Sequence, residues 1–365
     1  MDIPTYFILF LHTFILFDMK NRIRYIFVAV VVMAATACTC NRTSNQLPKK
    51  EKEVKAASIS VDIIRFEQEL FACNPNAMEA ELEKLQAKYP VFYNVFYNQV
   101  LNIPAIGDKQ VQLNVMRDFI AKKATKGLYD TVQEKFKNID FLKEDLKTAF
   151  ANYKSYFPEK PTPKVYTCIS EFSYSVFTAT DSILGISLDK YLGPKYIYYP
   201  SIFMEYTYMI PSLDKKYMAI DCANVLGANI VPVPGDKSTL LDKMIAEGKI
   251  LYFIQSLLPD KKPNDIIKYD EKHWKFCVDN EPQIWAYFLD HELLYNTKFE
   301  QYKYVKEGPT TYGMPKESPG RVGAWLGWQI VQAYMKEHPN TTLKQLIALT
   351  DGQKILSASR YKPKR

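Results

Sequence analysis

The sequence predicts a mainly helical α+β fold, in a single domain with a small antiparallel sheet. Apolar residues recur at helical spacing over most of the chain after residue 58. Residues 165–188 differ, because they are rich in β-branched and aromatic residues and contain a polar turn at 180–182. No internal repeat or second linker interrupts residues 58–365, so we expect these residues to form one domain.

Local signals predict each element in chain order. A short strand is expected near the start of the domain, where Ile59, Val61 and Ile63 alternate with other residues. In the last helix we expect Ser318 to be the N-cap and Pro319 to occupy the first position. The expected helices span residues 78–89, 113–120, 142–153, 217–230, 240–258, 281–295 and 320–335, and the expected paired strands span 165–169 and 175–188.

The N-terminus predicts a lipoprotein signal. A basic segment at 20–24 precedes an apolar stretch at 25–37, which is shorter than the roughly 20 residues that cross a bilayer. Ala37 is small enough for a signal peptidase, and Cys38 follows it directly. We therefore expect residues 1–37 to be a signal sequence and the Cys38 thiol to carry fatty acyl chains such as palmitate, which anchor the mature protein to the lipid bilayer.

Other interpretations of this region remain open. A plain signal peptide or a short membrane anchor would leave the cysteine incidental, and Cys40 is a second acceptor candidate. The residues before Met19 are apolar but have no positive charge in front of them, whereas Met19 starts a complete signal by itself. We expect translation to begin at Met19, with a two-helix membrane hairpin as the alternative.

Residues 38–57 are predicted to be a flexible lipidated tether, because they are polar and charged. The formal net charge of the whole chain, +7, is spread along the sequence without a basic cluster, so we expect no nucleic-acid partner. The six cysteines show no CxxC pattern. We expect most of them to be buried free thiols, although one disulfide is possible.

Catalytic motifs are incomplete in this sequence. His291-Glu292 begins like the HExxH helix of zinc peptidases, but Tyr295 replaces the second histidine. No phosphate-binding glycine loop and no GxSxG elbow occurs. Carboxylate pairs such as Glu205 with Asp221 are more often surface charges than acid–base pairs. We therefore expect no catalytic residue, no metal site and no cofactor.

Glycines predict close packing of helices at two places. Gly248 interrupts the apolar helix at 240–258, and a second helix lying over it would explain its presence. Its neighbours Glu247 and Lys249 are expected to face solvent. Near the C-terminus, glycines three and four residues apart should form one stripe of a helix, and they are Gly320, Gly323 and Gly327.

Aromatic residues surround this glycine stripe. Trp285, Trp325 and Trp328 are expected to pack in a structural cluster, with a partner-binding surface as the alternative. Arg321 stands between two of the glycines and could pair with Glu281 or Asp290. The candidate structural or interaction residues are Glu247, Glu281, Trp285, Arg321, Trp325 and Trp328.

Several segments together resemble the GldB family of gliding-motility lipoproteins from Bacteroidetes. The resemblance covers about residues 59–365 and implies a non-catalytic, lipid-anchored envelope protein whose partners are envelope proteins of the gliding and associated secretion machinery. Surface export of lipoproteins in these bacteria resembles a sorting step that reads acidic residues soon after the lipidated cysteine. Residues 39–42 contain none, so we expect the domain to face the periplasm. The segments that carry the resemblance are 247–253, 280–285, 291–295, 318–323, 327–331 and 356–363.

A more remote resemblance relates the paired helices to zinc peptidases, in which one helix carries HExxH and the next carries Glu-Gly. Glu247-Gly248 resembles the second element, whereas residues 219–225 lack both histidines. This implies a degenerate zinc-peptidase-like (gluzincin-like) fold that has lost its metal. The alternative is a hydrolase of metallopeptidase ancestry with an unrecognised active site.

Replacing the proposed acceptor tests the lipid anchor. In Cys38→Ser cells, labelling with a fatty-acid analogue should be lost and the protein should leave the membrane fraction, because no thiol remains to be acylated. Continued labelling would mean that Cys40, or no cysteine, is the acceptor.

Overall fold

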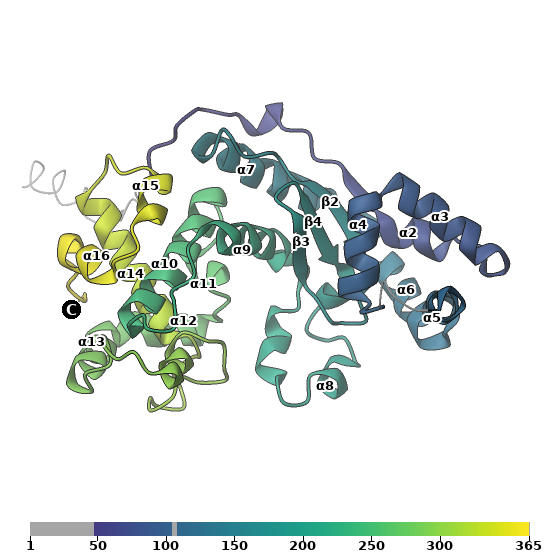
Figure 1. The fold of residues 1–365 in the computed structure, drawn as a ribbon. Helices are drawn as coiled ribbons and strands as arrows, with labels where there is room; N and C mark the ends of the chain where they lie inside the picture. The colour runs from purple at the N-terminus through teal and green to yellow at the C-terminus, as the bar shows by residue number, and fades with distance from the viewer. Residues whose placement is uncertain (1–46, 104–107, 365) are drawn as a thin grey trace, which may run out of the picture. The chain divides into compact units, whose positions relative to one another are not determined.

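A computed structural model describes residues 47–103 and 108–364, and its central feature is a small sheet with helices on both faces (Figure 1). The predicted signal sequence and Cys38 lie outside the described residues. The described residues form one compact unit. No helix in the described part of the chain is long and apolar enough to cross a membrane.

The sheet has four strands in the order β1-β2-β4-β3. Strand β4 pairs antiparallel with β3 but parallel with β2, and β2 pairs parallel with β1. The predicted antiparallel hairpin is therefore correct for β3 and β4, whereas the sheet as a whole is mixed. The strands are β1 (Ile63–Arg65), β2 (Lys164–Cys168), β3 (Val176–Thr180) and β4 (Ile183–Ser187).

Helices make up most of the chain, as predicted. Expected helices form at all seven predicted places, but the one predicted at 281–295 ends earlier, at Asp290. The described helices are α2 (Phe66–Phe71), α3 (Met78–Lys88), α4 (Pro90–Val95), α5 (Lys109–Ala121), α6 (Lys123–Lys135), α7 (Asp140–Tyr156), α8 (Tyr199–Ile202), α9 (Met218–Ile230), α10 (Leu240–Leu257), α11 (Pro263–Ile266), α12 (Glu271–Asp279), α13 (Glu281–Asp290), α14 (Val322–Glu337), α15 (Leu343–Ala348) and α16 (Gly352–Ser359).

Two apolar cores lie on the two faces of the sheet. Val165 and Leu184 belong to the larger core, which includes α6, α7, α9, α10 and α14. The neighbouring residues Tyr166 and Cys168 belong to a smaller core with α2 to α5. Successive strand residues point to opposite faces of the sheet, and β2 contributes apolar side chains to the cores on both faces. The strand is therefore buried on both sides.

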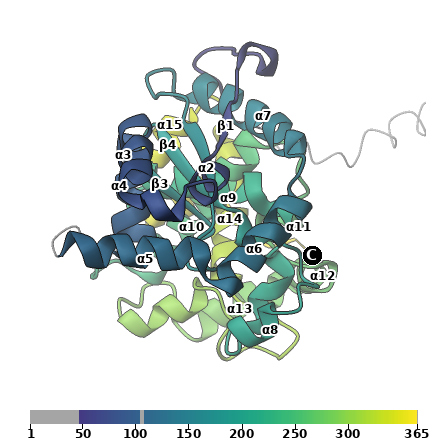
Figure 2. The same ribbon diagram turned by 90° about the vertical axis from the view of Figure 1, so that its right-hand side faces the viewer.

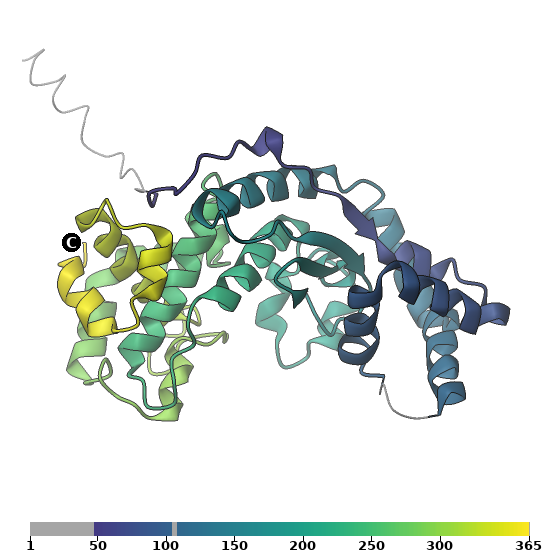
Figure 3. The ribbon, with the colours of Figure 1, turned by 45° about the horizontal axis from the view of Figure 1, so that its top comes forward.

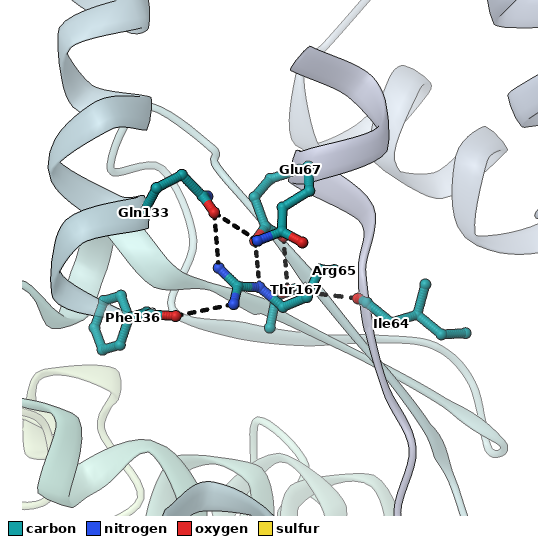
Figure 4. A network of polar contacts seen from close by, with 7 residues as sticks. Ile64, Arg65, Glu67, Gln133, Phe136 and Thr167 are labelled. Atoms are coloured by element: carbon teal, nitrogen blue, oxygen red, sulfur yellow. Dashed lines mark hydrogen bonds and ion pairs between the residues drawn. The ribbon is translucent and has the colours of Figure 1, made fainter. Parts of the chain in front are cut away.

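A buried polar network joins β1 to the elements beside it (Figure 4). The Arg65 Nε donates to Glu67 Oε1 at 2.5 Å, and the Thr167 hydroxyl on β2 donates to the other oxygen of Glu67 at 2.6 Å. Arg65 also donates to the carbonyl oxygen of Phe136 and to Gln133. Glu67 is 1% exposed, so these partners compensate the cost of burying its charge.

Part of the predicted tether contacts the domain. Residues expected to form a free tether run beside α7 ahead of β1 (Figure 3). The backbone N–H groups of Glu51 and Lys52 donate to the carbonyl oxygen of Ser155, and the N–H of Val54 donates to its hydroxyl. Lys49 forms a β-bridge with Thr342. These contacts hold the described part of the predicted tether against the rest of the domain.

Helices α10 and α14 approach each other at glycines, as the sequence predicts for Gly248. A methyl group on Gly248 would overlap the backbone of Gly327 on α14, and one on Gly327 would overlap the carbonyl oxygen of Met244 on α10. No side chain larger than hydrogen fits at either position without separating the helices. The packing of two backbones against each other therefore explains both glycines.

The predicted glycine stripe is divided among three different contacts. Helix α14 begins at Val322, so Gly320 lies before it and approaches the backbone of Gly308. A methyl group on Gly323 would lie 2.7 Å from the carbonyl oxygen of Tyr304. Only Gly327 approaches another α-helix.

The predicted N-cap of α14 is wrong. Ser318 and Pro319 precede the helix, and the capping position belongs to Arg321, which has φ 62° and makes no side-chain capping bond.

The four cysteines in the described residues are free and buried, as predicted for most of the thiols.

The contact between α10 and α14 predicts opposite effects of alanine at two helical glycines. Gly327→Ala should lower the free energy of unfolding by about 1–3 kcal/mol, because the methyl group overfills the contact. Gly127→Ala on α6 is the matched control, since a methyl group there meets nothing within 4 Å, and it should raise stability by about 0.4–1 kcal/mol. Denaturant unfolding of both variants measures the difference, and equal effects would contradict the assigned contact.

Candidate functional site

Two adjoining cavities form a charged cleft beside α9 and α10. Their volumes are 320 Å³ and 100 Å³, and Lys268, Glu307 and Arg321 line both. Asp221 on α9 and Glu247 on α10 line the larger cavity. We call these five residues and the space between them the charged cleft.

Asp221 is held by two groups of the protein itself. Its Oδ1 lies 2.5 Å from the Lys268 ammonium, and its Oδ2 accepts a hydrogen bond of 2.7 Å from the Tyr191 hydroxyl. The carboxylate is 11% exposed at the side chain. Burial, followed by the charge of Asp221, raises the pKa of Tyr191 far above its usual value, so the phenol remains a hydrogen-bond donor.

Arg321 connects the other two acidic residues of the cleft. Its guanidinium lies 3.2 Å from Glu247 and 3.5 Å from Glu307, and its side chain is only 15% exposed. Burial lowers the pKa of Arg321, but the two carboxylates outweigh burial and keep the pKa above its usual value. The predicted partners Glu281 and Asp290 are therefore wrong, and Arg321 pairs with Glu247 and Glu307.

The turn before α14 holds Arg321 in an uncommon conformation. Its φ of 62° lies in the left-handed region, which non-glycine residues seldom adopt. The Tyr269 hydroxyl donates to the carbonyl oxygen of Gly320 at 2.6 Å, and the Thr311 hydroxyl donates to that of Pro319 at 2.7 Å. Backbone strain of this kind occurs at functional sites and persists only where surrounding contacts impose it.

The other predicted interaction residues lie outside the cleft. Glu281 accepts a hydrogen bond of 2.7 Å from the Tyr361 hydroxyl, and Trp285 packs edge-on against the Tyr361 ring. Trp325 and Trp328 are each 1% exposed. The tryptophans of α14 therefore belong to the core, as the structural interpretation predicts, and they offer no partner-binding surface.

Lys249 does not face solvent, contrary to the prediction. It is 3% exposed, and its ammonium donates to the carbonyl oxygen of Leu349. Burial lowers the pKa of Lys249 to about 8. Glu247, two residues earlier, is 35% exposed at the side chain and points into the charged cleft, so the two charges flanking Gly248 have different environments.

The incomplete HExxH segment does not contribute to the cleft. His291 follows α13, is exposed, and contacts the carbonyl oxygen of Tyr287 through its Nδ1. Within residues 47–103 and 108–364, no three His, Cys, Asp or Glu side chains gather in a group that could hold a metal ion.

Lys268 and Glu307 are site residues that the sequence does not predict. No motif marks either residue, and their places in the cleft depend on how the loops after α11 and before α14 fold. Lys268 has φ 61°, another uncommon conformation that the sequence does not reveal. Of the candidate pair Glu205 and Asp221, only Asp221 lines the cleft.

An aromatic lobe, residues 193–213, borders the cleft and includes α8. Tyr208, Met209 and Ser212 of this lobe line the smaller cavity. The lobe is closed at its base, where the Gly193 N–H donates to the carbonyl oxygen of Leu213 and Leu192 forms a bridge with Asp214. Its outer residues include four large apolar side chains that are more than half exposed, Ile197, Tyr198, Met204 and Tyr206.

Buried hydrogen bonds fix the base of the aromatic lobe. The Tyr199 hydroxyl donates to the carbonyl oxygen of Asp189 at 2.7 Å and accepts from the N–H of Leu192 at 3.0 Å. Tyr199 is fully buried. The lobe thus carries exposed apolar side chains on a rigid base, which is typical of a loop that binds a ligand or a partner protein.

The fold and the cleft define an α+β protein with an ion-paired cleft between helices. Comparison with known families finds that the family described as "Gliding motility protein GldB" matches residues 48–363, nearly the whole chain. The chain therefore belongs to the GldB family, a family of gliding-motility lipoproteins of the cell envelope. Comparisons with curated proteins and with solved structures find no match.

Substitutions at Arg321 separate its ion pairs from its backbone strain. Arg321→Ala should lower the free energy of unfolding by about 1–3 kcal/mol, because Glu247 and Glu307 lose their partner. Arg321→Gly should be about 1 kcal/mol more stable than Arg321→Ala, because glycine adopts positive φ without strain.

Arg360 is the matched control. It has φ 49° and pairs with Glu337, but its side chain is 81% exposed, so Arg360→Gly should cost little or stabilise the protein. Denaturant unfolding measures all three variants. A loss at Arg360 equal to that at Arg321 would contradict a special role for the cleft.

Proposed function

We propose that this protein is a non-catalytic envelope lipoprotein, anchored through Cys38, which acts by binding other envelope proteins of the gliding and secretion machinery. The observation that carries the proposal is the charge pairing in the cleft. Each acidic side chain there contacts a cation of the protein, Asp221 with Lys268, and Glu247 and Glu307 with Arg321.

The arrangement of α9 and α10 supports an origin from a metal-binding site. The segment that resembles the first peptidase element lies on α9, the Glu-Gly element lies on α10, and both face the larger cavity through Asp221, Asn224 and Glu247. A metal ion there would have to displace Lys268 and Arg321, which already neutralise two of these oxygen ligands. Lys268 and Arg321 thus neutralise the carboxylates that a bound metal ion would otherwise neutralise.

The aromatic lobe is the proposed contact surface for a protein partner. Ile197 is 76% exposed and Met204 is 74% exposed, and both lie within the same short segment of chain. Exposed apolar side chains concentrated in one place are typical of an interaction surface, and tyrosines are enriched in such surfaces.

The competing proposal is a hydrolase of metallopeptidase ancestry with an unrecognised active site. Metal analysis of the protein purified without chelators separates the two proposals. We expect less than stoichiometric zinc in the wild-type protein and in Asp221→Asn. Stoichiometric zinc that is lost in Asp221→Asn would overturn the non-catalytic proposal, because it would place a metal in the cleft.

Substitution of the lobe tests the partner-binding proposal in cells. Met204→Ser should leave the melting temperature within error, because the side chain is exposed, and should abolish colony spreading or secretion in the host. Val233→Ser is the matched control, since Val233 is an exposed apolar residue outside the lobe, at 82% exposure, and it should behave like wild type. Normal spreading and secretion in Met204→Ser would remove the lobe from the proposal.

A further inference from the structure

We propose that a groove between α3, α4 and α5 binds a carbohydrate. Helix α3 packs against both α4 and α5, and Figure 2 shows α5 crossing below the other two. Their apolar side chains belong to the smaller core, on the face of the sheet opposite the larger core. The groove has a volume of 240 Å³. This inference is independent of the proposed function, because none of the groove residues belongs to the cleft or the lobe.

A pair of aromatic rings lines one side of the groove. Tyr93 and Tyr97 are stacked, with centroids 5.6 Å apart and an angle of 17° between the planes. Tyr93 is 6% exposed and fixes the position of its neighbour, while Tyr97 is only partly buried. A sugar ring has one face of C–H groups, which packs on the negatively polarised face of an aromatic ring.

Polar side chains line the opposite side and the rim. The Gln86 amide donates to Asn94 Oδ1 at 3.1 Å, and the Lys109 ammonium bridges Glu79 and Glu83. These amides and carboxylates combine donors and acceptors at short spacing, as hydroxyl groups around a sugar ring require. The near balance of charge disfavours a polyanionic ligand such as a nucleic acid.

One buried acceptor in the groove has no partner within the protein. Asn98 Oδ1 is shielded from solvent and accepts no hydrogen bond. Leaving such a group unpaired costs free energy, and rotation of the Asn98 side chain toward the groove, where a ligand hydroxyl donates to Oδ1, would remove that cost.

The backbone that carries Asn98 is also unusual. Residues Phe96–Val100 form a π-helical turn (η3) directly after α4, and this turn places both Tyr97 and Asn98 in the groove. Short π-helical turns are rare and occur frequently at functional sites. An unpaired acceptor, a stacked aromatic pair and a π-helical turn therefore meet at one place.

Binding to two soluble saccharides tests the inference and distinguishes two sources of the ligand. N-acetylglucosamine tetramers represent the glycan strands of the cell wall, and cellotetraose represents neutral surface polysaccharide. Titration calorimetry on the full lipoprotein in detergent should show binding of one of them. Asn98→Ala should weaken that binding at least about tenfold, because a buried hydrogen bond is lost.

Two further variants keep the test decisive. Gln99→Ala on the same π-helical turn is the matched control, since Gln99 is exposed and does not line the groove, and it should bind like wild type. Glu83→Gln on the exposed rim should weaken binding without affecting folding, which covers the case that Asn98→Ala fails to fold. Absence of binding for both saccharides at millimolar concentration, or binding unchanged in Asn98→Ala and Glu83→Gln, would overturn the inference.

Discussion

The contact between Gly248 and Gly327 fixes the geometry of the charged cleft. Because neither glycine has a side chain, α10 and α14 approach until their backbones touch. Glu247 directly precedes Gly248, and Arg321 directly precedes α14, so the same approach brings the carboxylate within 3.2 Å of the guanidinium. Any side chain that separated the two helices would also separate this ion pair.

Ion pairing, in turn, determines what the cleft can do. A buried carboxylate without a partner is costly, and the protein provides partners from three different loops and helices. Lys268 and Arg321 both adopt left-handed backbone conformations at these places, which shows that the surrounding structure imposes their positions. A cleft whose acidic groups are already neutralised is better suited to a stable shape than to binding a metal ion, and this is why we favour a binding protein over an enzyme.

The surfaces that we propose for binding stand on rigid supports on both sides of the sheet. The aromatic lobe rests on the buried hydroxyl of Tyr199, and the carbohydrate groove rests on the core formed by α2 to α5. A rigid surface loses less conformational entropy on binding than a flexible one does. The domain family assigns the chain to gliding motility, and the two surfaces suggest how one lipoprotein could contact a protein partner and a glycan at the same time.

The sequence by itself determined the helices, the β3–β4 hairpin and the close packing at Gly248, because each depends on local periodicity or on a residue type with a specific backbone property. It also predicted that most cysteines are buried free thiols, as the four in the described residues are. Only the tertiary structure decided the parallel pairing of β1 and β2, the partners of Arg321 and the burial of Lys249. The partners of Arg321 come from distant parts of the chain, and many other carboxylates lie at comparable distances in the sequence. The sequence therefore does not tell which carboxylates Arg321 contacts. The same holds for residues 51–54, which are polar enough for a tether but bind α7, because their backbone N–H groups donate to the carbonyl and hydroxyl oxygens of Ser155 near the end of that helix.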